Sequence, residues 1–279
     1  FNCFIPIFFG SVQLQKPLHQ KCYFLVIFSK TMSDNIRESM DLEGTLPEFE
    51  SLAQIAFLKK KMHKRLIKAQ DTLAEEHRII NTRFYTKCQA YAKDPVAGEK
   101  RYGPIKDWHV SDVTRMDNAF KCNDCKIQKK HKMDISNWDV SKVKSMNNMF
   151  KNVHEFDCDL SKWNVSRCES MDFMFYNCIH FNSDLSKWDV SKVCSMESMF
   201  DGAKQFTCND NPISLSQWRV DNVMDMKSMF KQSIFKGNIS TWNVSKVNDM
   251  SFMFSLSDFS GFIGAWDVSN VVNMSFMFC

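Results

Sequence analysis

The sequence has little glycine and proline, with 8 and 6 of them among 279 residues, and its glycines never gather into a phosphate-binding loop. It shows no serine elbow and no recurring pair of carboxylates, which disfavours the common classes of hydrolase. The apolar runs near the start are short: the one at 22–28 has seven residues, and a membrane span needs roughly 20. These absences predict a protein with no catalytic residues, no cofactor and no membrane span.

An excess of charge of one sign is also absent from most of the chain. Residues 1–100 carry 15 Lys+Arg against 11 Asp+Glu, whereas residues 101–279 carry 21 of each. No nucleic-acid partner is therefore expected, because such a partner normally requires a basic face. The 11 cysteines are odd in number and have no fixed spacing, which disfavours a secreted disulfide framework and favours an intracellular protein.

The main feature of the sequence is a tandem repeat marked by tryptophan. All seven tryptophans lie in register, at steps of 30, 25, 25, 30, 24 and 24 residues: Trp108, Trp138, Trp163, Trp188, Trp218, Trp242 and Trp266. Helix-pair repeats need about 33 residues or more, so this period predicts a stacked array of shorter units. Repeats 1 to 7 are named below after these tryptophans in chain order, and positions are counted from the tryptophan.

Other apolar positions keep the same frame. Position +8 is always methionine: Met116, Met146, Met171, Met196, Met226, Met250 and Met274. Position +12 is always phenylalanine: Phe120, Phe150, Phe175, Phe200, Phe230, Phe254 and Phe278. A residue type that is the same in every copy is what packing demands, and methionine is an adaptable filler. The tryptophan, methionine and phenylalanine columns are therefore predicted to form the core.

The consensus also suggests a backbone. Leu-Ser-x-Trp-Asp-Val alternates apolar and polar residues, which predicts a short strand, and Asp or Asn with Ser suits a corner. Met-x-x-Met-Phe predicts a helical turn. The expected fold is mainly β with short helical turns, a leucine-rich-repeat-like solenoid of seven coils over residues 101–279, preceded by a long α-helical segment. The two 30-residue steps predict loop insertions around 122–132 and 207–212.

The N-terminal third is a different unit. Residues 1–31 are expected to be a translated upstream leader, because Met32 looks like a natural start. Residues 32–100 are expected to form a helical segment, with an amphipathic helix between 47 and 93 that caps the array or pairs with a second chain. The array stops inside a repeat at Cys279, so it is expected to be truncated.

One weak metal candidate lies in the first insertion. Cys122 and Cys125 have the C-x-x-C spacing, and His131 follows them. A structural zinc site normally needs four ligands, and no second pair stands nearby. Free cysteines in a loop are therefore the expectation, with zinc as the alternative.

The stretch Trp188–Phe200, with Phe181–Ser186 before it, resembles the repeat of BspA-like leucine-rich-repeat surface proteins, a type first noted in mycoplasmas as a domain of unknown function. The resemblance covers about residues 101–279. It implies a leucine-rich-repeat solenoid without catalytic residues and a role in adhesion or protein binding, often at a cell surface. The chain has no convincing signal peptide or anchor, so the cell surface and the cell interior both stay open as locations.

Two functions follow as hypotheses. The first is a non-catalytic scaffold that binds a protein or a cell-surface glycan through outward polar positions and the two insertions. The second is a structural or assembly protein that forms homo-oligomers through residues 47–93.

Overall fold

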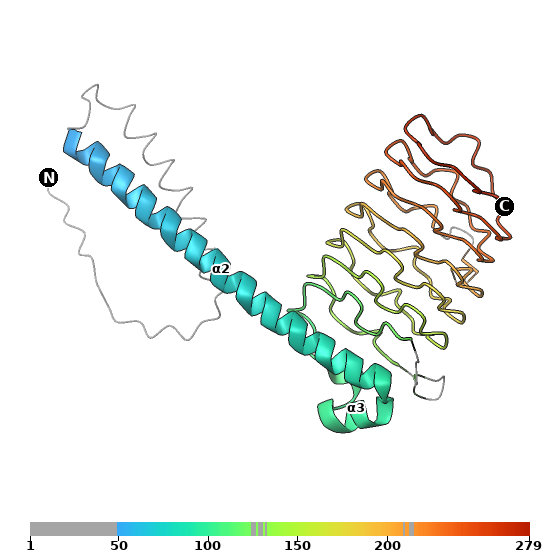
Figure 1. The fold of residues 1–279 in the computed structure, drawn as a ribbon, viewed down its shortest axis with the longest axis horizontal. Coiled ribbons are helices and arrows are strands. Elements are labelled where there is room, and N and C mark those ends of the chain that lie inside the picture. Colours follow the sequence, from blue (N-terminus) through green and yellow to red (C-terminus); the bar gives the residue numbers. More distant parts are fainter. Residues whose placement is uncertain (1–48, 124–126, 128–130, 132, 209, 212–214) are drawn as a thin grey trace, which may run out of the picture. The chain divides into compact units, whose positions relative to one another are not determined.

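The computed structural model of the protein describes residues 49–123, 127, 131, 133–208, 210–211 and 215–279. The expected leader at 1–31 lies outside these residues, as do residues 32–48. The chain divides into two compact units, 1–67 and 68–279. The described helices are α2 (Phe49–Lys93), α3 (Pro95–Tyr102) and the short 3-10 helix η1 (Ile105–Asp107), and the repeats follow them (Figure 1).

Helix α2 is a single helix of 45 residues. Neither glycine nor proline interrupts it, and its middle is rich in Lys, Leu, Ala, Gln and Glu, which are strong helix formers. It ends before Pro95, because a residue that precedes proline is pushed out of the α region, and Asp94 is extended at φ −153°. The carboxylate of Asp94 then caps α3 by accepting from the amide of Ala97 at 3.0 Å.

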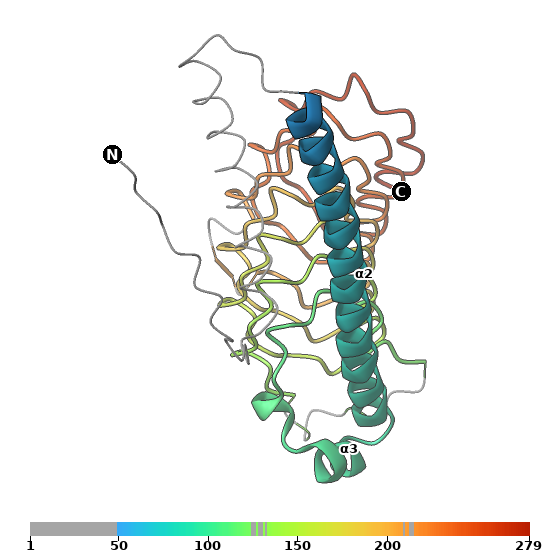
Figure 2. The same cartoon turned by 90° about the vertical axis from the view of Figure 1, so that its left-hand side faces the viewer.

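The repeats stack through backbone hydrogen bonds. Amides at positions +8, +10, +12 and +14 donate to the carbonyls at +7, +9, +11 and +13 of the next repeat. Between repeats 3 and 4 these bonds join Met171 to Ser195 (3.2 Å), Phe173 to Glu197 (2.8 Å), Phe175 to Met199 (3.0 Å) and Asn177 to Asp201 (2.8 Å). Both views show successive repeats lying beside one another from green to red (Figures 1 and 2). Each repeat is thus held by its neighbours rather than by itself.

The mainly β fold class expected from the sequence is wrong, and with it the leucine-rich-repeat-like β solenoid. Within the part of the chain that the structure describes there is no β-strand and no sheet. What joins the repeats here is a series of isolated parallel bridges at position +7, which run from Arg115–Ser145 to Asp249–Asn273. The segment expected as a strand closes into turns instead, because the amide of each tryptophan donates to the carbonyl at −3 and the amide at +5 donates to that at +2.

The helical turn expected for Met-x-x-Met-Phe is absent as well. Position +10 is left-handed in every repeat, with φ between 52° and 58°: Asn118, Asn148, Phe173, Ser198, Ser228, Phe252 and Phe276. A left-handed residue can continue neither a right-handed helix nor a strand. The segment therefore runs through consecutive turns, each of which presents its next amide to the following repeat.

The interior is filled by aromatic columns. The rings at +12 stack from repeat to repeat with centroids 5.6–5.9 Å apart, from Phe120 to Phe278. A second column holds Phe156, Phe181, Phe206 and Phe235 at 5.6–5.9 Å. In the other repeats of this column the phenylalanine stands seven residues before the tryptophan. Phe206 stands 12 residues before Trp218 and still occupies the same place in the column, so the second insertion begins after Phe206.

The tryptophans are buried and also hydrogen-bonded. Each indole from repeat 2 onward donates from Nε1 to the carbonyl at −3 of the preceding repeat, at 2.9–3.1 Å: Trp138 to Ile105, Trp163 to Ile135, Trp188 to Leu160, Trp218 to Leu185, Trp242 to Leu215 and Trp266 to Ile239. The indole of Trp108 donates to Gly103 instead. Every buried indole N–H therefore has an acceptor, which removes the cost of burying it.

Candidate functional site

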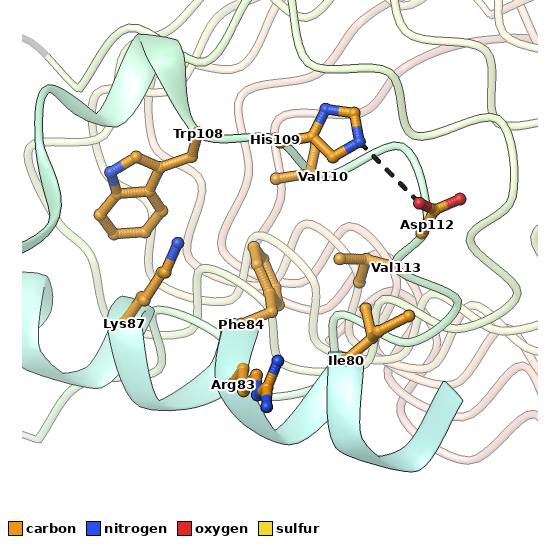
Figure 3. A pocket seen from close by; sticks show the side chains of 9 residues that line it. All are labelled: Ile80, Arg83, Phe84, Lys87, Trp108, His109, Val110, Asp112 and Val113. Atoms are coloured by element: carbon orange, nitrogen blue, oxygen red, sulfur yellow. Dashed lines mark ion pairs between the residues drawn. The ribbon is translucent and has the colours of Figure 1, made fainter. Parts of the chain in front are cut away.

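A hollow of about 230 Å³ lies between the last turns of α2 and repeat 1 (Figure 3). We call it the helix–repeat hollow. Its apolar lining comes from Ile80, Phe84, Trp108, Val110 and Val113, and its polar lining from Arg83, Lys87, His109 and Asp112. The four residues from α2 recur at i, i+3, i+4 and i+7, so they share one face of the helix. Figure 3 shows Ile80, Phe84 and Lys87 pointing toward repeat 1, with Arg83 lying along α2 beside them.

Hydrogen bonds from Asn81 fix α2 on repeat 1. In later repeats the amide at +6 donates to the preceding repeat, as Lys144 does to the carbonyl of Thr114 at 2.8 Å. Thr114 has no preceding repeat, and its amide donates to Oδ1 of Asn81 at 3.0 Å. The same oxygen accepts from the amide of Arg115 at 3.3 Å. Asn81 thus supplies the acceptor that a preceding repeat supplies elsewhere.

Aromatic contacts hold the same helix face. The ring of Phe84 meets Trp138 edge-on at 5.7 Å, and the ring of Tyr91 meets Trp108 edge-on at 6.1 Å. Phe84, Cys88 and Tyr91 are all buried. The hollow therefore has a rigid apolar wall, since its residues belong to the packed core on both sides.

The charges around the helix–repeat hollow are unevenly matched. The carboxylate of Asp112 receives the ammonium of Lys142 at 2.6 Å. Among the described residues, Arg83 and Lys87 have no hydrogen-bonded or ion-paired side-chain partner. The ammonium of Lys87 lies 5.7 Å from the ring centroid of Trp108, within the range of a cation–π contact. The hollow is therefore apolar inside and positively charged at its edge.

Ser111, His109 and Asp112 resemble a catalytic triad in composition but not in geometry. The hydroxyl of Ser111 lies 3.0 Å from Nε2 of His109, and the carboxylate of Asp112 lies 3.9 Å from that same nitrogen. In a triad the serine and the carboxylate bind opposite nitrogens of the ring, so that one orients the ring while the other loses its proton. Here both face Nε2, and the arrangement cannot pass a proton from serine to histidine in that way.

A second, polar hollow of about 480 Å³ lies where repeats 3 and 4 meet, and Asp157, Asp159 and Asp184 line it. Asp159 and Asp184 accept from the amides of Ser161 and Ser186, each at 2.9 Å. The pKa of Asp159 is lowered, first by the amide of Ser161, and the pKa of Asp184 is lowered by its hydrogen bonds despite partial burial. Both groups stay ionised at neutral pH, so neither suits a general acid.

Residues 96–212 and 206–279 match the family described as "Mycoplasma protein of unknown function, DUF285". The chain belongs to the DUF285 family. No curated protein and no solved structure matches it. The DUF285 match begins inside α3, so it contains the repeat side of the helix–repeat hollow but not Ile80, Arg83, Phe84 or Lys87. The hollow is thus built by a DUF285 repeat together with a helix outside the matched residues.

The DUF285 repeats bury most of the expected core columns. All seven tryptophans are at most 8% exposed, and the methionines at +8 and phenylalanines at +12 of repeats 1 to 6 are at most 2% exposed. In repeat 7, Met274 is 40% and Phe278 63% exposed, since no further repeat covers them here. Packing thus requires a neighbour on both sides of each repeat.

The candidate zinc ligands do not meet as a described site. Cys122 is buried and His131 is half-buried, while Cys125 lies outside the described residues. In the described part of this DUF285 chain, no group of three or more His, Cys, Asp or Glu side chains could hold a metal ion. No helix there has the length and apolar composition that crossing a bilayer requires.

The sequence did not predict that Arg83, Lys87 and His109 line one site. For His109 alone a sequence signal existed, because position +1 is Asp or Asn in five other repeats. There Asp139, Asn164, Asp189, Asn243 and Asp267 each accept from the amide two residues on. The corner expected from Asp or Asn with Ser is therefore confirmed. His109 and Arg219 depart from this pattern, and His109 lines the helix–repeat hollow.

Proposed function

We propose that this DUF285 protein is a non-catalytic scaffold whose helix–repeat hollow binds a protein partner. The observation that carries the proposal is the size of the hollow together with its lining. Small-molecule sites usually measure about 300–1,000 Å³, and about 230 Å³ is less than that. A hollow of this size suits one large apolar side chain, and such anchors in fitted pockets dominate protein interfaces.

The edge of the hollow indicates the chemistry of the partner. Arg83 and Lys87 lie one helical turn apart on α2, and Asp112 is neutralised by Lys142. A partner with a carboxylate beside its apolar anchor would pair these cations, and charge complementarity of this kind sets specificity and association rate. A neutral glycan would leave both cations unpaired. A protein segment is therefore the favoured partner over a glycan.

The repeat pattern supports the same role. The consensus around Trp188 is similar to that of BspA-like leucine-rich-repeat surface proteins, for which adhesion and protein binding are the expected roles. In repeats 1 to 6 the residues that are constant in all repeats are buried, so they build the stack, and those that differ are free to bind.

Peptide titration of the full chain tests the proposal. The probe is a labelled peptide with one leucine between glutamates, and fluorescence anisotropy measures its binding. The charge-reversed variant R83E/K87E should weaken binding by at least roughly tenfold, as should replacing the peptide leucine with alanine. The matched control is Lys93→Glu, an exposed residue of α2 outside the hollow. The proposal would be contradicted if R83E/K87E bound the peptide as tightly as the wild type does, or if the alanine peptide bound as tightly as the leucine peptide.

A specific observation also favours the assembly function. On α2, Phe57, Leu58, Leu66 and Ile67 are 65%, 48%, 40% and 44% exposed, which is unusual for large apolar side chains. Light scattering of the full chain and of its L58K/L66K variant would test this role. A dimer that the variant converts to a monomer would support it, and a monomeric wild type would exclude it.

A further inference from the structure

The ammonium of Lys151 lies in a corner formed by two aromatic rings. Its Nζ is 4.2 Å from the ring centroid of Phe173 and 4.6 Å from that of Tyr176. The two rings are 5.9 Å apart and inclined at 56°, so they form two walls rather than one stack. A cation within about 6 Å of a ring face is attracted by the ring quadrupole, and here two rings act on one cation.

The backbone of repeat 3 creates the corner. Phe173 occupies +10 and Tyr176 occupies +13, and the amide of Tyr176 donates to the carbonyl of Phe173 at 3.2 Å. One turn therefore carries both rings. Repeat 3 alone has aromatic residues at both positions. In repeat 6, where only +10 is aromatic, the ammonium of Lys231 lies 5.6 Å from the single ring of Phe252.

A buried carboxylate lies beside the corner in the next repeat. Asp201 occupies +13 of repeat 4 and is 7% exposed. No side chain in the described ranges donates to its carboxylate or pairs with it within 4.0 Å. Burial raises its pKa to about 6, although the charges of Lys231 and Lys151 lower it. A carboxylate that is largely buried and has no ion-pair partner is costly, which makes its position a candidate for function.

The Lys151 ammonium is held in the corner without an ion pair to any described residue. Burial lowers the pKa of its ammonium, and the carboxylates of Glu197 and Asp201 only partly offset this. Among the described residues, neither carboxylate lies within 4.0 Å of the Lys151 ammonium. Glu197 pairs with Lys227 at 3.2 Å instead. The rings thus hold Lys151 with no direct hydrogen bond to a carboxylate.

We propose that the corner of Phe173 and Tyr176, with the carboxylate of Asp201 beside it, is a binding site for an alkylated ammonium group. Lys151 occupies this site until the ligand displaces it. A methylated ammonium fits the corner better than a primary one, because it has few or no N–H groups to satisfy and the rings offer no strong acceptor. Once Lys151 moves out, the charge of Asp201, which already acts on the Lys151 ammonium, would act on the ligand.

The site is independent of the helix–repeat hollow, since its residues belong to repeats 2 to 4. Tetramethylammonium chloride is the first probe, added to the isotope-labelled full chain, with sodium chloride at equal ionic strength as the salt control. In the wild type, the rings shift the NMR signals of the Lys151 side chain, and the probe should return them toward those of an exposed lysine. Sodium should not.

Variants sharpen the test. Lys151→Gln should bind tetramethylammonium roughly tenfold more tightly than the wild type, because the competing ammonium is gone. Adding Asp201→Asn should remove most of that gain. Lys192→Gln is the matched control, since this exposed lysine of repeat 4 takes no part in the corner, and it should bind like the wild type. Choline and a trimethyl-lysine peptide then distinguish a small-molecule source from a protein source.

Three results would overturn the proposal. The Lys151 signals could respond equally to sodium and to tetramethylammonium. Lys151→Gln could bind no more tightly than the wild type, or Asp201→Asn could leave its affinity unchanged. Circular dichroism and the thermal midpoint of each variant establish that it is folded. If a variant fails to fold, the displacement of Lys151 by tetramethylammonium in the wild type still tests the proposal, because that experiment needs no variant.

Discussion

The indole nitrogen of Trp188 donates a 3.0 Å hydrogen bond to the carbonyl oxygen of Leu160 in the preceding repeat. The same oxygen accepts from the amide of Trp163 at 3.0 Å. One carbonyl therefore closes the turn of its own repeat and anchors the ring of the next. This explains why tryptophan holds its position in all seven repeats, since no other apolar side chain has the volume and the donor together.

Replacement of this indole should be costly. Trp188→Phe removes the donor and leaves a cavity, so we expect it to lower the free energy of unfolding by about 2–3 kcal/mol. Urea unfolding followed by circular dichroism measures the change. Lys192→Ala, an exposed residue of the same repeat, is the control and should stay within about 0.5 kcal/mol. Equal stability of Trp188→Phe and the control would show that the indole bond is unimportant.

The left-handed residue at +10 gives a second prediction. Asn148 has φ +57°. Asn148→Val should destabilise the protein by about 1–2 kcal/mol, because a β-branched residue is strained in this region. Asn148→Gly should change stability by only a few tenths, since glycine adopts positive φ freely but loses more entropy on folding. Thermal unfolding of both variants compares them, and a valine variant as stable as the glycine variant would contradict the assigned conformation.

The buried hydroxyl of Tyr91 gives a third. It has no hydrogen-bond partner among the described residues, and burial, with the charge of Glu99, raises its pKa to about 12. Tyr91→Phe should therefore be neutral or stabilising by up to about 1 kcal/mol. Gly98→Ala should be destabilising instead, because a Cβ there would meet the Cα of Tyr91 at 2.7 Å. A loss of stability in Tyr91→Phe would mean that the hydroxyl has a partner.

The carboxyl of Asp201 gives a pH dependence with a defined sign. Its pKa is raised from 3.8 to about 6, so the folded protein favours the protonated form. Stability from this group is fully present below pH 3.8 and is lost as the pH rises through 6. The protein should therefore lose about 1–3 kcal/mol from this group between pH 4 and pH 7.5.

Asp201→Asn isolates that contribution. At pH 7.5 the variant should be more stable than the wild type, and the difference should shrink toward pH 4. Asp189 and the other carboxyls with a lowered pKa stabilise the folded protein at every pH between 4 and 7.5. Their contribution to stability is lost only as the pH falls below the usual pKa of 3.8. Chemical unfolding at several pH values measures the difference. A variant less stable than the wild type at pH 7.5 would show that the carboxylate is stabilising.

The sequence pattern predicts which side chains face inward but not the path of the backbone. Trp188 and Met196 belong to columns that are identical in every repeat, so their burial follows from register. The turns could not be predicted, because the left-handed position +10 is occupied by Asn, Ser or Phe and never by glycine. Alternating apolar residues then looked like a strand, although they are the first and last residues of turns whose central residues are mostly polar.

The sites depend on contacts that no local pattern records. Arg83 and Lys87 meet His109 only because α2 packs on repeat 1. Lys151 meets Phe173, and its charge acts on that of Asp201, because consecutive repeats place positions +10 and +13 close together. In the sequence, nothing distinguishes the residues of these sites from other residues of their type. They come together only through the packing of α2 and the stacking of the repeats.

The direction of the hydrogen bonds between repeats has one more consequence. Four amides in each of repeats 1 to 6 donate to the following repeat, and four carbonyls in each of repeats 2 to 7 accept from the preceding one. The backbone bonds are thus the same at every junction between these repeats, so the backbone by itself sets no limit on how many repeats can stack.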